Sequence, residues 1–277
     1  MKRLACFIAC LPLAAAADWD APQQPFPLYG GSYYVGPHGV SSVLITSHAG
    51  HILIDSGTPK SPQQIAAHIR ALGFRVEDIK AILVSHEHYD HSGGVAALQR
   101  LSGATVMTSP HAGQVLESGK PDPGDPQYGG LPDMEPVARV KAVADGELVT
   151  VGPLRVKALY TPGHTRGGMS WTWIAVENGK ALNMVYADSM NAVSAGGFRY
   201  SGSAAYPAAK ADVERSIARV AALPCDILVT AHPEASRLFE RQARGKAALV
   251  DPAACRSYAE AGRARLAQTL AQEARQR

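Results

Sequence analysis

Residues 86–91 carry three histidines and an aspartate, and this cluster constrains the chain more than any other feature. The side chains are those of His86, His88, Asp90 and His91. Imidazole nitrogen and carboxylate oxygen are common protein ligands of zinc. Without a metal, so many polar groups in a partly buried place would lack partners. The cluster therefore predicts a metal site.

The flanking sequence places the cluster in the turn between a strand and a helix. Residues 79–84 are a short apolar run typical of a buried strand, and residues 92–98 are typical of a helix entrance. Residues two apart in an extended chain point the same way, so His86 and His88 can converge on one ion. Asp90 and His91 lie past the bend and can turn towards a second ion. One loop can thus supply ligands to two metals.

Two further histidines, His164 and His232, each follow a strand-like segment, at residues 154–160 and 227–230. A catalytic zinc keeps three protein ligands and a free position for water. The cluster and these two histidines together supply enough ligands for two zinc ions, and we expect the segments to meet at one sheet edge. The histidines that stand alone in the sequence are expected to be ordinary surface or core residues: His38, His48, His51, His68 and His111.

Residues 1–17 have the pattern of a secretory signal peptide. Lys2 and Arg3 form its positive end, residues 4–13 its apolar stretch, and residues 14–17 a small-residue cleavage region. We expect the mature chain to begin near Asp18 and to be exported to the periplasm. No later segment reaches about 18 apolar residues, so we expect no stable membrane association.

The cysteine pattern agrees with export. Cys6 and Cys10 leave with the signal peptide, so Cys225 and Cys255 remain as a pair in an oxidising compartment. They are predicted to form a disulfide that pins the C-terminal helix to the segment before residues 227–230, with two inert buried thiols as the alternative. Loss of the two leader cations lowers the formal net charge from +3 to +1. The sequence shows no sign of a nucleic-acid-binding surface. We expect a monomer.

Apolar runs bounded by turn residues predict strands, and helix-like patterns lie outside them. The predicted strands are residues 32–35, 43–46, 51–55, 79–84, 105–108, 148–151, 155–160, 169–176, 181–187 and 227–230. The predicted helices are residues 61–72, with Ser61 as the cap and Pro62 in the first turn, 95–100, 111–118, 208–222 and 253–273. Residues 120–136 are rich in proline and glycine and are predicted to be an irregular loop. We expect an α+β fold with a single domain over residues 18–277.

Five motifs, in this order, resemble the metallo-β-lactamase superfamily over essentially the whole mature chain. They are LIDSG at 53–57, HEHYDH at 86–91, TPGHT at 161–165, YADS at 186–189 and AHP at 231–233. Residues 162–171 and 186–189 are more narrowly similar to subclass B3, the secreted dizinc β-lactamases. The resemblance implies the metallo-β-lactamase fold, a four-layer αβ/βα sandwich with its active site in a shallow groove along one edge.

The resemblance also divides the ligands between two zinc ions with a zinc-bridging hydroxide between them. It gives His86, His88 and His164 to the first ion, and Asp90, His91 and His232 to the second. The hydroxide, oriented by Asp90, would attack the lactam amide of a β-lactam antibiotic, and the two ions would stabilise the oxyanion and the released nitrogen. Asp55 would anchor the ligand loop, or else is an ordinary carboxylate at a strand end.

Contacts to the substrate are expected from hydroxyl and amide groups, because a β-lactam carries a carboxylate near its ring. The resemblance points to Ser189 and Asn191 beside the second zinc. From the irregular loop, Gln127 or Tyr128 can reach over the metals.

Other functions remain open at this point. Glyoxalase II enzymes and lactonases of the superfamily place an aspartate that bridges both metals just after the strand ending near residue 187. If Asp188 takes that position, the β-lactamase interpretation weakens; the subclass resemblance favours Ser189 there, unbound to metal. The signal peptide argues against these usually cytoplasmic hydrolases. Fold alone does not separate a hydrolase from a zinc-dependent binding protein without catalysis.

Overall fold

The computed structural model describes residues 18–276, so the predicted signal peptide at 1–17 lies outside the described residues. The strands are β1 (Phe26–Tyr29), β2 (Ser32–Tyr34), β3 (Val43–Ile45), β4 (His51–Ile54), β5 (Ile79–Leu83), β6 (Thr105–Thr108), β7 (Val140–Ala142), β8 (Leu148–Val151), β9 (Leu154–Tyr160), β10 (Met169–Glu177), β11 (Lys180–Ala187) and β12 (Ile227–Thr230). The helices are α1 (Ser61–Ala71), α2 (Tyr89–Ser92), α3 (Val95–Ser102), α4 (Pro110–Ser118), α5 (Ala209–Ala221), α6 (Leu238–Ala243) and α7 (Ala254–Arg275), with 3-10 turns η1 (Val76–Asp78), η2 (Pro233–Ser236) and η3 (Lys246–Leu249).

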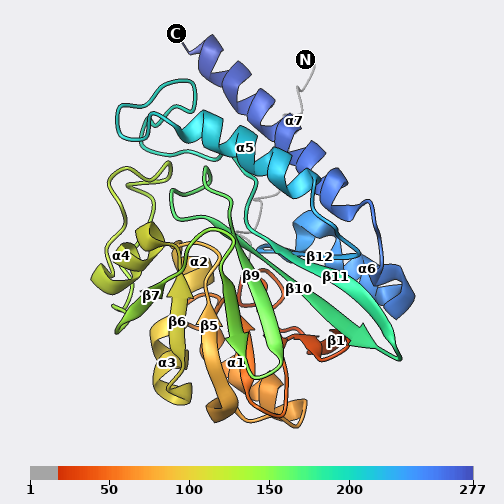
Figure 1. The fold of residues 1–277 in the computed structure, drawn as a ribbon. Helices are drawn as coiled ribbons and strands as arrows, with labels where there is room; N and C mark the ends of the chain where they lie inside the picture. Colours follow the sequence, from red (N-terminus) through yellow and green to blue (C-terminus); the bar gives the residue numbers. More distant parts are fainter. Residues whose placement is uncertain (1–17, 277) are drawn as a thin grey trace, which may run out of the picture.

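The strands form two sheets packed face to face. One has seven strands in chain order, β1 to β7, and the other has five in the order β12-β11-β10-β9-β8. Figure 1 shows α5 and α7 side by side on the outer side of the second sheet, with α1 and α3 at the opposite side of the molecule, against the first. The predicted α+β, four-layer sandwich is confirmed.

Three apolar clusters hold the four layers together. The cluster between the sheets contains Trp171 and Trp173 of β10. The cluster under α1 and α3 contains Ile65 and Ile82, and the one under α5 and α7 contains Ile217. Full burial of one large apolar side chain stabilises the fold by about 1.5–3 kcal/mol. The layers therefore form a firm support for the loops at their rim.

Two strands are absent from the sequence prediction, and both lie at the edges of the first sheet. β1 contains Pro27, which has no N–H for a ladder and is tolerated at an edge. β7 is short, and its Lys141 is exposed, so it lacks the apolar alternation of a strand with one buried face. The predicted loop at 120–136 contains no helix or strand. Several other predicted bounds differ by one to three residues.

Ser61 does not cap α1 as predicted. The capping position belongs to Lys60, without a side-chain hydrogen bond. The Ser61 hydroxyl accepts the N–H of Thr58 at 2.9 Å and donates to Asp20 Oδ1 at 2.6 Å. Ser61 thus closes the turn before the helix instead.

Helix α7 is linked to the segment before β12 by a disulfide between Cys225 and Cys255, as predicted, with Cα atoms 6.2 Å apart. Within residues 18–276, no helix combines the length and the apolar character needed to cross a membrane.

The loops that carry the candidate ligands meet at one rim of the sandwich. β4 is parallel to β5, and β11 is parallel to β12, so their carboxyl ends share a direction within each sheet. Two backbone hydrogen bonds join the sheets at this rim. The N–H of Met169 donates to the carbonyl of Ser85 at 2.7 Å, and the N–H of Ser41 donates to the carbonyl of Ala231 at 2.8 Å. The expectation of a single sheet edge was wrong, because apolar runs mark strands without indicating which sheet they enter.

Candidate metal centre

The residues after β5 form the centre of the site. His88 has an extended backbone, with φ −70° and ψ 147°, and the one-turn helix α2 starts at the next residue. Asp90 and His91 lie on that turn. The change from extended chain to helix directs the two pairs to different places, as their spacing predicts.

His164 and His232 come to this loop from the second sheet. His164 lies between β9 and β10, after Gly163, whose φ is 131° and whose added Cβ would come within 2.5 Å of Val213. That position requires glycine. His232 follows directly on β12 and Ala231.

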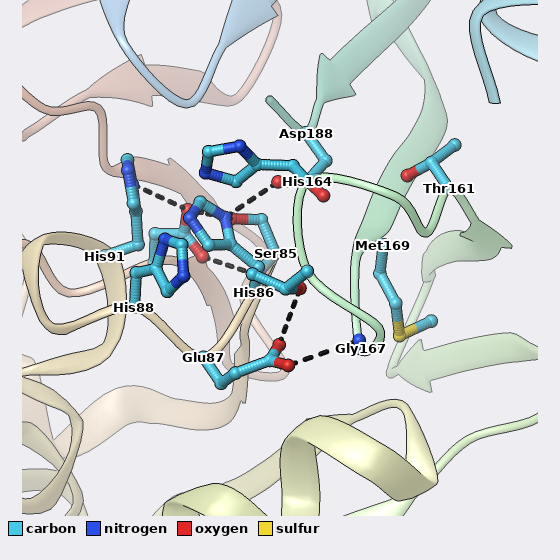
Figure 2. A network of polar contacts seen from close by, with 12 residues as sticks. Ser85, His86, Glu87, His88, His91, Thr161, His164, Gly167, Met169 and Asp188 are labelled. Carbon is cyan, nitrogen blue, oxygen red and sulfur yellow. Dashed lines mark hydrogen bonds and ion pairs between the residues drawn. The ribbon is translucent and has the colours of Figure 1, made fainter. Parts of the chain in front are cut away.

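The first group of candidate ligands consists of His86, His88 and His164. One ligand atom from each lies within 4.8 Å of the others, and all three residues are buried. Figure 2 shows their imidazoles gathered in one place beside His91. We call this set the first group.

Each imidazole of the first group has one ring nitrogen close to an oxygen atom. His86 Nδ1 is 2.7 Å from Asp188 Oδ1, and His88 Nε2 is 3.0 Å from Asp125 Oδ2. His164 Nδ1 is 2.8 Å from the carbonyl oxygen of Asn191. A metal-binding histidine characteristically donates its other N–H to a carboxylate or carbonyl. The opposite nitrogen of each ring is left for a metal, and His86 Nε2 is buried without a hydrogen-bond partner.

The second group consists of Asp90, His91 and His232, and its ligand atoms lie close together. Asp90 Oδ2 is 3.1 Å from His91 Nε2 and 3.3 Å from His232 Nε2, and these two nitrogens are 3.1 Å apart. A tetrahedral zinc with bonds of about 2.0–2.2 Å keeps its ligand atoms roughly 3.3 Å apart. The spacing of the second group therefore fits one zinc ion.

The outer nitrogens of the second group also have oxygen neighbours. His232 Nδ1 is 3.1 Å from the carbonyl oxygen of Gly39, and His91 Nδ1 is 3.7 Å from Asp55 Oδ2. Both imidazoles thus expose Nε2 to the metal position. Both groups have a donor set that suits zinc.

At His86, His164 and Asp90 the protonation state at neutral pH is the one that binds a metal. Burial, followed by the nearby imidazoles, lowers the pKa of His86 well below its ordinary value, and burial lowers the pKa of His164 to about 3. Burial alone would raise the pKa of Asp90, but His91 and His232 hold it well below the usual range. Neutral imidazole and ionised carboxylate are the forms that bind a metal. At His88 and His232 burial would lower the pKa, but hydrogen bonds to Asp125 and Asp90 raise it above its ordinary value.

Asp55 connects the ligand loop to both sheets. It is fully buried with φ 58°, and it accepts the N–H and the hydroxyl of Ser85, each at 2.6 Å. The hydroxyl of Tyr186 donates to it at 2.7 Å. Asp55 therefore contacts the residue that precedes His86, consistent with an anchoring role.

Asp188 lies behind His86 rather than between the two groups. One oxygen contacts His86 Nδ1, and the other lies so close to Gly168 that an added Cβ would come within 2.5 Å of it. A ring nitrogen engaged by a carboxylate is not free for zinc, so Nε2 is the ligand atom of His86. This placement argues against a bridging role for Asp188.

Two of the residues predicted to contact substrate, Asn191 and Gln127, are connected to the first group. Gln127 is half-buried, and its N–H donates to Asp125 Oδ1 at 2.7 Å; Tyr128 is exposed. Ser189 is buried next to Asp188. Asn191 contacts His164 through its carbonyl, while its side-chain oxygen accepts Arg265 Nη1–H at 2.9 Å.

Two carboxylates in the site were missed from the sequence. Asp125 orients His88, and Glu87 is buried with Oε2 accepting the Thr165 hydroxyl at 2.9 Å and Oε1 accepting the Gly167 N–H at 3.2 Å. Figure 2 shows Glu87 reaching to Gly167. Glu87 thus joins the loop of His164 to the ligand loop. The Asp-Pro-Gln sequence at 125–127 favours a turn, but only the folded chain brings it to His88.

Comparison with known proteins gives one consistent family. Residues 35–175 match the family model described as "Metallo-beta-lactamase superfamily". The crystal structure of MEM-A1, a subclass B3 metallo-β-lactamase from a soil metagenome library, is 61% identical, covers 94% of this chain and 100% of that one, and has a TM-score of 0.93. The structure of metallo-β-lactamase SMB-1 bound to 2-mercaptoethanesulfonate is 48% identical, with 92% and 99% covered and a TM-score of 0.89.

A curated relative carries a different activity in its name. The hydroxyacylglutathione hydrolase of Pseudomonas paraeruginosa (strain DSM 24068 / PA7) is 31% identical over 178 residues, which are 64% of this chain and 54% of that protein. The chain thus spans about half the length of this relative.

Proposed function

The chain belongs to the metallo-β-lactamase superfamily, and on that premise we propose that it is an exported dizinc β-lactamase of subclass B3 that hydrolyses the amide of β-lactam antibiotics. Two observations together carry the proposal: the two three-ligand groups, and a similarity to a subclass B3 structure that extends over 94% of the chain at 61% identity. The first group would hold one zinc ion and the second group the other.

The ions would supply the chemistry that a strained cyclic amide needs. Bound zinc supplies an acidified water and Lewis-acid stabilisation of negative charge that develops on the carbonyl oxygen and the leaving nitrogen.

The chain's own residues would bind and orient the reactants. Asp90 remains ionised beside His91 and His232, so its carboxylate can accept a hydrogen bond from the attacking water as well as bind metal. Asp125 forms a hydrogen bond with His88, and Asp188 Oδ1 lies 2.7 Å from His86 Nδ1, which also contacts the Ser85 hydroxyl at 3.2 Å; these contacts would orient the two imidazoles. Little reorganisation of these ligands is then needed during the reaction.

Recognition of the substrate is assigned to residues around the groups. Ser189, Asn191 and Gln127 offer hydroxyl and amide donors for a carboxylate, although the side-chain oxygen of Asn191 is already engaged by Arg265. The SMB-1 structure contains 2-mercaptoethanesulfonate, a thiol with an anionic group. We expect the same compound to bind this chain and to inhibit it.

Thioester hydrolysis is the second candidate, because of the 31% identity to a hydroxyacylglutathione hydrolase. The position of Asp188 behind His86 argues against it, since that activity was expected to place a bridging aspartate here. The disulfide and the predicted signal peptide support export of a mature chain of residues 18–277 to the periplasm. We propose that this chain acts as a single-domain monomer.

One experiment separates the candidates. Purified zinc-loaded protein is incubated with a penicillin, a cephalosporin, a carbapenem, a homoserine lactone and a glutathione thioester, with and without chelator. We expect chelator-sensitive opening of the β-lactams and little turnover of the other two. Full zinc loading without any β-lactam opening would contradict the proposal, and a chain inert to all five would indicate a binding protein.

A further inference from the structure

Helix α7 directs one row of side chains at the irregular segment that follows β11. The row consists of Tyr258, Gly262, Arg265, Thr269 and Glu273, spaced three or four residues apart and hence on one helix face. The segment, residues 188–201, contains no helix or strand and carries the partners of two first-group imidazoles.

Tyr258 fixes the start of this segment. Its buried hydroxyl donates to the carbonyl of Asp188 at 2.9 Å and accepts the N–H of Met190 at 3.0 Å. Gly262 lets the helix approach, because an added Cβ would come within 2.9 Å of the Met190 side chain. The backbone of Asp188 is thus held while its carboxylate contacts His86 at 2.7 Å.

Arg265 fixes the next part. Its guanidinium donates to Asn191 Oδ1 at 2.9 Å, and the carbonyl of Asn191 faces His164 Nδ1 at 2.8 Å. Thr269 donates to the carbonyl of Ala192 at 2.9 Å. Buried backbone groups need partners, and here side chains of α7 take the place of a strand ladder.

The outer ring nitrogens of the second group have their oxygen neighbours outside residues 188–201. His91 Nδ1 faces Asp55 at the end of β4, and His232 Nδ1 faces the carbonyl of Gly39. Changes on the α7 row should therefore affect the two groups unequally.

We propose that Tyr258 and Arg265 are positioning residues for the first zinc site, acting through Asp188 and Asn191 to orient His86 and His164. The inference rests on the zinc centre of the proposed function. Its test measures metal affinity, so it gives an answer whether or not the protein opens a β-lactam.

The experiment compares Tyr258→Phe and Arg265→Gln with two matched controls in the full mature chain. Arg263→Gln changes an exposed arginine of the same helix, and Tyr29→Phe removes a hydroxyl that donates to the carbonyl of Lys180. Zinc affinity is measured by chelator competition in a His232→Ala background, which leaves only the first group intact. The second group is measured in a His86→Ala background.

We expect Tyr258→Phe and Arg265→Gln to weaken zinc binding by the first group about 3-fold to 10-fold, less than the 10-fold to 100-fold typical when a direct partner of a ligand is lost. Binding by the second group should change less than about 2-fold. Both control variants should retain the parent affinity, and thermal unfolding of every variant is recorded alongside.

A double-mutant cycle tests the route of the effect. If Arg265 acts through Asn191, then Arg265→Gln combined with Asn191→Ala should weaken binding no more than the larger single effect. The proposal is overturned if the first-group affinity is unchanged, if both groups weaken equally, if Arg263→Gln has the same effect, or if the combined effects are additive. A lowered melting temperature with unchanged affinity would show that α7 is only part of the core.

Discussion

Asp125 Oδ2 lies 3.0 Å from His88 Nε2, so a loop without regular structure orients one of the candidate zinc ligands. Both side chains are buried. The other oxygen of the Asp125 carboxylate accepts the backbone N–H of Gln127 at 2.7 Å, so this carboxylate also holds the loop at Gln127. The metal site and the segment expected to contact substrate therefore share one carboxylate.

Replacement of this carboxylate should weaken the first zinc site. Asp125→Ala is expected to lower its zinc affinity about 10-fold to 100-fold, because the His88 ring loses the acceptor that orients it. Asp125→Asn keeps an acceptor oxygen and should have a smaller effect. Chelator competition measures both, with Asp133→Ala as a control at an exposed aspartate near the end of the same loop. Parent-like affinity in Asp125→Ala would show that the contact does not support the ligand.

His232 tests the division of the ligands. His232→Ala removes one of the three atoms that lie 3.1–3.3 Å apart in the second group and leaves the first group intact. We expect one tightly bound zinc per chain instead of two, as measured by elemental analysis after dialysis. His48→Ala, at an exposed histidine, should keep both. Two tight zinc ions in His232→Ala would refute the grouping.

How much of the site the sequence predicts depends on how far apart the residues lie along the chain. The paired placement of His86 with His88, and of Asp90 with His91, follows from local geometry alone. The partners of the imidazoles do not, because Asp125 and Asn191 lie in loops that only tertiary packing brings to the ligands. Asn191 shows the limit most clearly, since the motif resemblance predicts a substrate contact for its side chain but not the contact of its backbone carbonyl with His164.

The strands, too, were predicted where the local sequence pattern is clear and missed where it is not. Strands with a buried face, such as β8 and β12, were predicted at their observed bounds. The edge strands β1 and β7 were missed, because one contains Pro27 and the other is short and largely exposed. Motif resemblance supplied the four-layer arrangement, which hydrophobic periodicity alone does not determine.

The disulfide should stabilise the fold without being needed for zinc chemistry. Cys225 and Cys255 are 30 residues apart in sequence, and in the chain-entropy model closing such a loop contributes about 3–4 kcal/mol. The double variant Cys225→Ser/Cys255→Ser should lose about that much unfolding free energy in urea titrations. The reduced parent should match it, and an unchanged midpoint would show that the loop is held by packing alone.

Glu273 should make stability depend on pH in acid. Its carboxylate accepts the N–H groups of Tyr200 and Ser201 at 2.7 and 2.8 Å. Burial would raise its pKa, but these bonds and Arg199 lower it below the ordinary value. A lowered folded-state pKa adds stability above the unfolded pKa, and this stability is lost as the pH falls through the folded pKa.

The parent should therefore lose more unfolding free energy than Glu273→Gln between pH 6 and pH 3. Urea titrations at both values, with chelator present throughout so that zinc release does not contribute, measure the difference. Equal losses in the two proteins would mean that the carboxylate has no depressed pKa.

Ser189 tests how the substrate is held. It is buried directly after Asp188, whose carboxylate contacts His86, and we propose that its hydroxyl faces the substrate rather than orienting a ligand. If the hydroxyl binds the substrate carboxylate equally in the ground state and in the transition state, Ser189→Ala should raise KM several-fold and change kcat little. Steady-state kinetics on a penicillin and a cephalosporin, at verified zinc content, give both constants. Ser194→Ala, at an exposed serine of the same segment, should leave them unchanged. A fall in kcat at constant KM would instead place the hydroxyl in contact with charge that develops only in the transition state, because uniform binding cannot alter the chemical step.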